Sequence, residues 1–161
     1  MLVDFNEMAA SSRVWVYQGP RPFSDKEVDY IAAKLTRFLT NWQAHGEDLM
    51  ASFLIKYKQF IVLAVDEAQA ATTGCSIDAS VHLIQQLEKD LNLELMNKMM
   101  ISYRDGSSIT TISMQEFKEY VAQEKVHPET IVFNNLVDSK AAFDSNWEVS
   151  ASRSWHARLL N

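Results

Sequence analysis

The sequence predicts an α+β fold with a ferredoxin-like core. Runs rich in β-branched and aromatic residues alternate with stretches of helical period in the order strand, helix, strand, strand, helix, strand (βαββαβ), which implies an antiparallel sheet. A C-terminal helical extension follows. A length of 161 residues, 47% of them hydrophobic, suits a single domain with its core at about residues 12–112 and the extension at about 113–161.

The first strand and the first helix carry the clearest local signals. Arg13–Gln18 is rich in Val and aromatic residues, which is typical of a strand. Ser24 and Glu27 form a capping box, in which each side chain accepts a hydrogen bond from the other residue's backbone amide. We expect the helix at about 25–45, with Gly46 as its C-cap.

The middle of the chain predicts a hairpin, a second helix and a fourth strand. We expect strands at about 51–57 and 60–65, joined by a tight turn at Lys58-Gln59. A stripe of apolar residues at helical spacing follows at about 78–91. The strand at about 98–103 completes the core.

The extension begins after a turn at Asp105-Gly106, where both residues tolerate positive φ. Ser113 and Glu116 form a second capping box. Residues 1–12 are expected to be a loose or weakly helical lead-in. The remaining expected elements are a return strand at 108–112, a short helix to about 123, a strand at 130–133, a helix from Ser139 through Trp147, and a last helix from Ser152 or Ser154.

The strand at 60–65 is apolar at every position, and Met99-Met100-Ile101 is similar. Strands that are apolar on both faces are normally covered on both faces. A ferredoxin-like core leaves one face of its sheet open, so something else must cover it. Either the tail from Ser113 to Asn161 or a second copy of the chain does so, and the second case predicts a homodimer.

Charge and composition exclude several classes of partner. The formal net charge is -6, from 15 basic and 21 acidic residues, and there is no basic block. We therefore expect neither nucleic-acid nor membrane binding, because both need clustered Lys and Arg. The single cysteine suits a reducing cytoplasm, and no apolar run reaches the ~18 residues that span a bilayer.

The candidate catalytic residues are Cys75, Asp78 and His82. They follow an acidic strand exit and a loop of small residues, at a predicted helix start. The field of a helix N-terminus stabilises a thiolate, and Asp78 and His82 are neighbours on a helix. This arrangement would supply a nucleophile, a base and an orienting group.

The same helix start is a candidate site for a small anionic ligand, because its free amides attract anions. Thr73, Gly74 and Ser76 are the candidate ligand-binding residues there. A structural interpretation stays open, in which Ser76 or Asp78 is the N-cap. If the helix includes Cys75, His82 lies ~10 Å from it along the axis, at about 1.5 Å per residue, which is too far for a direct pair.

Trp15 and Tyr17 share one face of the first strand and, with Arg13, are candidates for a ligand or partner surface. The alternative is that the two rings pack beneath Trp147 and Trp155 of the tail.

No cofactor or metal is expected. The four histidines and Cys75 show no short ligand spacing, and the four glycines are too scattered for a phosphate loop.

Two stretches, Gly74-Cys75-Ser76-Ile77-Asp78-Ala79-Ser80-Val81-His82 and the tail from Asn146-Trp147-Glu148-Val149 to Ser154-Trp155-His156, resemble a family of small uncharacterised bacterial proteins, some of which are labelled transporter ATPase. The resemblance implies no catalytic residues. The ATPase label lacks a phosphate-binding loop to support it.

Two functions follow from these observations. The first is a cytosolic, non-catalytic binding or interaction protein, expected to be a homodimer. The second is an anion-binding protein or enzyme that uses Cys75, Asp78 and His82.

Overall fold

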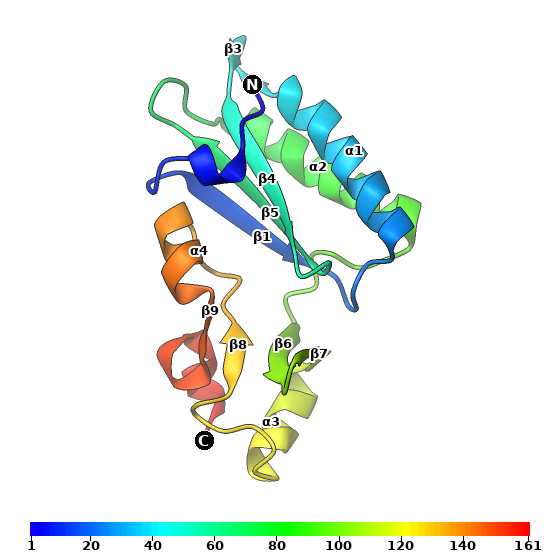
Figure 1. Ribbon diagram of the computed structural model, residues 1–161, viewed down its shortest axis with the longest axis vertical. Coiled ribbons are helices and arrows are strands. Elements are labelled where there is room, and N and C mark those ends of the chain that lie inside the picture. The colour runs from blue at the N-terminus through cyan, green and yellow to red at the C-terminus, as the bar shows by residue number, and fades with distance from the viewer.

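The computed structural model describes all 161 residues and has an α+β fold with four α-helices and three antiparallel sheets (Figure 1). The helices are α1 (Asp25–Thr40), α2 (Gly74–Leu91), α3 (Met114–Ala122) and α4 (Lys140–Asn146). The strands are β1 (Arg13–Gln18), β2 (Gln43–Ala44), β3 (Glu47–Asp48), β4 (Met50–Lys56), β5 (Phe60–Asp66), β6 (Met100–Asp105), β7 (Ser108–Ser113), β8 (Ile131–Phe133) and β9 (Glu148–Ser150).

The first sheet has the order β1-β5-β4, and α1 and α2 lie together on one of its faces (Figure 1). The predicted element order is present, but the complete ferredoxin-like sheet is not shown. The strand that should lie beside β1 is β6, and β6 pairs with β7 and β8 instead. The amide of Gln18 donates to the Leu95 carbonyl, and the Gln18 side chain then donates to the Met100 carbonyl. These contacts hold the start of β6 at the end of β1 rather than along its edge.

Both faces of β5 are covered from within the chain. Residues from Phe60 to Val65 are all 0% exposed. The odd-numbered residues of β5 pack with α1 and α2, whereas Phe60, Val62 and Ala64 pack with the N-terminal segment and with residues 133–147. The second face of β5 therefore does not require a second copy, and the homodimer stays a prediction.

The second sheet, β7-β6-β8-β9, lies below the first in Figure 1 and has its own hydrophobic cluster. α3 and the C-terminal segment pack against it around Phe117, which is 0% exposed. The extension is thus not only helical. The strand predicted at 130–133 is present as β8, and β9, which was not predicted, joins the same sheet.

The predicted helix boundaries are clearly wrong at two places, the end of α1 and the start of α2. The capping boxes of Ser24 with Glu27 and of Ser113 with Glu116 are both confirmed. The prediction of a helix at 25–45 is wrong beyond Thr40, since Asn41 is the C-cap and Gly46 (φ +78°) lies in the turn between β2 and β3. Trp42 is buried after the helix, where its Nε1 donates to the Ser76 carbonyl.

The start of α2 and two other regions also differ from the predictions. α2 starts at Gly74 and not near residue 78, because Thr73 caps it. The β4–β5 turn includes Tyr57, which takes φ +53° as Lys58 does. Residues 1–12 include a short 3-10 helix at Phe5–Glu7, which agrees with the weakly helical alternative. The segment is packed and not loose, since Phe5 and Met8 are buried and the Val3 amide donates to the Ala51 carbonyl.

None of the helices combines the length and the apolar composition that crossing a membrane would require.

Candidate functional site

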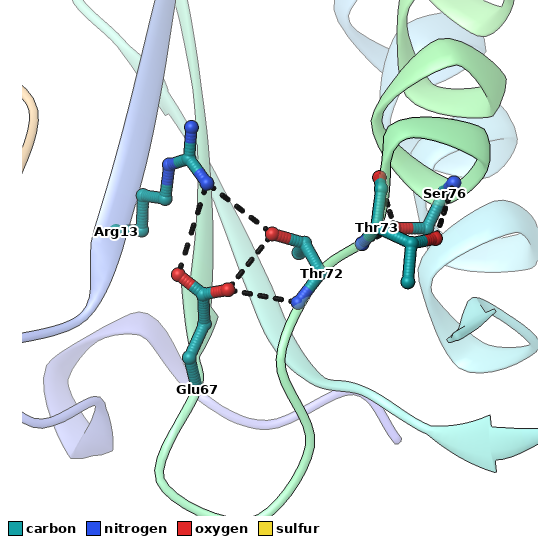
Figure 2. A network of polar contacts seen from close by, with 5 residues as sticks. All are labelled: Arg13, Glu67, Thr72, Thr73 and Ser76. Carbon is teal, nitrogen blue, oxygen red and sulfur yellow. Dashed lines mark hydrogen bonds and ion pairs between the residues drawn. The ribbon is translucent and has the colours of Figure 1, made fainter. Parts of the chain in front are cut away.

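The start of α2 is fixed by a capping box between Thr73 and Ser76 (Figure 2). The Ser76 amide donates to the Thr73 hydroxyl at 3.1 Å, and the Thr73 amide donates to the Ser76 hydroxyl at 2.7 Å. Ser76 is only 4% exposed. Two of the amides that would attract an anion are therefore already used inside the protein.

The loop before α2 is tied to β1 through Glu67 (Figure 2). The Glu67 carboxylate accepts hydrogen bonds from the amide and the hydroxyl of Thr72, both at 2.8 Å. Arg13 lies 3.9 Å from the same carboxylate and donates to the Thr72 hydroxyl at 3.3 Å. The guanidinium of Arg13 also stacks over Trp15, so this loop is held in place by β1.

The three candidate catalytic residues are not brought together. Cys75, Asp78 and His82 are all exposed on α2, and no hydrogen bond joins any two of them. Because the helix does include Cys75, the thiol and the imidazole are two turns apart, ~10 Å at about 1.5 Å per residue. None of the three lines the cavity that runs along β1.

That cavity lies between β1, the middle of α2 with the segment after the helix, and the second sheet, and has a volume of about 470 Å³. This is within the size range of small-ligand sites, about 300–1,000 Å³. β1 contributes every one of its residues to the wall. The other walls come from α2 with the segment after it (Val81, Leu95, Met96, Asn97, Lys98), from β6 (Met100, Ser102), from residues 133 and 135–138, and from Trp155 and His156.

Trp15 and Tyr17, singled out from the sequence, both line this cavity. The alternative that they pack beneath Trp147 is wrong, since Trp15 meets Trp42 edge-on, with ring centroids 6.4 Å apart. Trp147 lies on the other face of the sheet among Phe60, Phe133 and Phe143. Trp155 does share the cavity with Trp15 and Tyr17.

Two polar side chains in the cavity wall lack a protein partner for one of their atoms. His156 is 1% exposed, and Ser154 occupies its Nδ1 at 2.5 Å, whereas its Nε2 makes no hydrogen bond. Burial lowers the pKa of His156 to about 4, so the ring is neutral at pH 7. The Tyr17 hydroxyl makes no hydrogen bond either, and burial raises its pKa.

The backbone of β1 also presents unpaired groups to the cavity. In an antiparallel pair, successive residues turn their amides alternately toward and away from the partner strand. The amides of Val14 and Gln18 donate away from β5, to the carbonyls of Asp138 at 3.1 Å and Leu95 at 3.3 Å. Val16, halfway between them, faces the same way, and neither its N–H nor its C=O bonds to any group on that side.

Sequence reasoning found the aromatic wall of the cavity but not His156 or the open edge of β1. A histidine in a short terminal segment carries no local signal of burial. The unpaired edge depends on where β6 goes after Leu95, which is decided by contacts distant in sequence. No group of three or more His, Cys, Asp and Glu side chains forms a candidate metal site.

Comparisons with protein-family models, with curated proteins and with solved structures found no match for this chain, so the family resemblance stays a prediction.

Proposed function

We propose that this protein is a non-catalytic binding protein that holds a small amphipathic ligand in the cavity beside β1. One observation carries the proposal: apolar rings and unpaired polar groups line the same 470 Å³ space. Ring surface supplies affinity when it is buried, and a few polar groups fix the orientation of a ligand.

The polar groups restrict which ligands can bind. A ligand that excludes water from these atoms must supply their hydrogen bonds itself, because a buried polar atom without a partner costs about 1–3 kcal/mol. His156 Nε2, the Tyr17 hydroxyl and the Val16 backbone each gain a partner when a ligand with matching groups enters.

Anilinonaphthalene sulfonate, a fluorescent probe for apolar sites, tests the proposal. Saturable binding is expected, with energy transfer from Trp15 and Trp155, which both line the cavity. Val81→Phe places a ring in the cavity wall and should weaken the probe's affinity at least tenfold. Val121→Phe is the matched control, because Val121 is also a half-buried helical valine but lies on α3.

Equal affinity in wild-type protein and Val81→Phe would contradict the proposal, as would a failure of the probe to saturate. Circular dichroism shows whether each variant keeps the wild-type fold.

A further inference from the structure

We propose that the ligand is a short free peptide of about three residues, which lies extended and parallel to β1 and pairs with its open edge. This inference rests on the proposed function and adds the chemical class of the ligand. It starts from the backbone groups that β1 turns toward the cavity.

Three groups in a row are open along this edge: the Val14 carbonyl, the Val16 amide and the Val16 carbonyl. They present an acceptor, a donor and an acceptor. A peptide that runs parallel to β1 places a donor, an acceptor and a donor opposite these three groups, all from its first and third residues. The first donor is the peptide's ammonium group, the acceptor is its first carbonyl, and the second donor is its third amide.

The edge is open over a limited length. It is closed at one end by the hydrogen bond from Val14 to Asp138 and at the other by the bond from Gln18 to Leu95. Four residues separate the two donors, which is ~13 Å at about 3.3 Å per strand residue. A tripeptide fits between these limits, whereas a longer strand would collide with one of them.

The charges at the two ends of the edge match a free peptide in the parallel direction. The Asp138 carboxylate lies at the Val14 end, and Lys98 lies on the segment that follows Leu95 at the Gln18 end. Neither makes an ion pair within the protein. Asp138 suits the peptide ammonium and Lys98 suits the carboxylate. Arg13, also near the Val14 end, is already engaged with Glu67.

The walls on either side of the edge are apolar and predict apolar peptide side chains. Trp15, Tyr17 and Val81 lie on the helix-covered side of the sheet, and Phe133 and Val137 lie on the other. Successive side chains of an extended peptide point to opposite sides, so both walls are used.

Amide NMR with the tripeptide Val-Ala-Val as the probe tests the pairing directly. The Val16 amide proton should shift downfield and exchange more slowly with solvent when the peptide is added. The amides of Val14 and Gln18 already donate within the protein and serve as internal controls with smaller changes.

Modified peptides test the proposed contacts in the wild-type protein. N-methylation of the third residue removes the donor to the Val16 carbonyl and should weaken binding at least tenfold. N-acetylation of Val-Ala-Val removes the ammonium group opposite Asp138 and should also weaken it. Equal affinity of the N-methylated and unmodified peptides would overturn the proposal.

Val16→Pro removes the edge donor and should abolish tripeptide binding. Ile55→Pro is the matched control on the far edge of the same sheet. Ala51 turns its amide outward to Met1, so Ile55 also faces outward. Tripeptide binding that survives Val16→Pro would overturn the proposal.

The anilinonaphthalene probe distinguishes a failure of the peptide proposal from a failure of the proposed binding function. If the probe binds and Val-Ala-Val leaves the Val16 amide unchanged, the peptide proposal fails and the cavity function stands. If neither binds, both fail.

Discussion

β5 and β1 are neighbours in one sheet, yet they differ in how their backbones are satisfied. β5 has a partner strand on each side, and its residues from Phe60 to Val65 are 0% exposed. β1 has β5 on one side and a cavity on the other. Both strands contribute side chains to the hydrophobic clusters on both faces of the sheet, so packing on two faces does not imply a backbone that is paired on two edges.

The largest expected effect on stability is that of proline at Val62, in contrast to proline at Val16 on the neighbouring strand. Val62 and Val16 are opposite in register. The amide of Val62 faces β4, so Val62→Pro removes a ladder bond in the middle of the sheet and should cost more than about 3 kcal/mol. Val16→Pro removes an amide without a partner at a strand edge, where proline is tolerated, and should cost only ~1 kcal/mol. Urea denaturation measures both.

Equal destabilisation by the two prolines would mean that the Val16 amide does have a partner. The Val62→Ala and Val16→Ala variants separate the loss of the side chains from the loss of the amides.

A smaller effect is expected at Gln18, where the edge of β1 ends. Its side chain donates to the Met100 carbonyl and accepts from Ser102 and Asn135, so it joins β1 to the second sheet. Gln18→Leu leaves these groups without their partner and should lower the free energy of unfolding by about 1–3 kcal/mol. Gln43→Leu, at an exposed glutamine, should change it by less than about 0.5 kcal/mol. A similar loss of unfolding free energy in Gln18→Leu and Gln43→Leu would contradict the role of Gln18 in joining β1 to the second sheet.

The smallest expected effect is on the pH dependence of stability, and it comes from His156 in the wall of the cavity beside β1. The pKa of His156 is about 4 in the folded state, against about 6.5 when unfolded. The unfolded chain therefore binds a proton first, and stability should fall by roughly 1 kcal/mol as pH drops from about 7 to about 5.5. His156→Phe should flatten this dependence, whereas His82→Gln, at an exposed histidine, should keep it. If the stability of His156→Phe kept the pH dependence of the wild-type protein, His156 would not be its cause.

The features that could be predicted from the sequence are those with a local physical cause. Ser24 and Ser113 cap helices because a hydroxyl and an acidic residue three positions later satisfy the first amides. The burial of 60–65 on both faces follows from its unbroken apolar run. The sequence alone left open whether the tail or a second copy of the chain covers the second face of this strand. Phe133, Phe143 and Trp147 of the tail pack on that face, together with Phe5 and Met8 of the N-terminal segment.

The features that could not be predicted depend on distant contacts. The sequence near β6 does not indicate that this strand leaves the edge of β1. Its position depends on hydrogen bonds to the side chain of Gln18, which lies more than eighty residues earlier in the chain. The site was predicted in part for the same reason. The aromatic face of Trp15 and Tyr17 is a local pattern, whereas the polar lining by His156 arises only when the C-terminus returns to the cavity.

The enclosed edge of β1 also bears on how this protein avoids self-association. An exposed strand edge is a template for pairing with another chain and a common start of aggregation. Here the unpaired groups of Val14 and Val16 lie in a space bounded by residues 135–138 on one side and by the segment after α2 on the other. These boundaries limit the length of any strand that could pair with the edge, which lowers its tendency to start polymerisation.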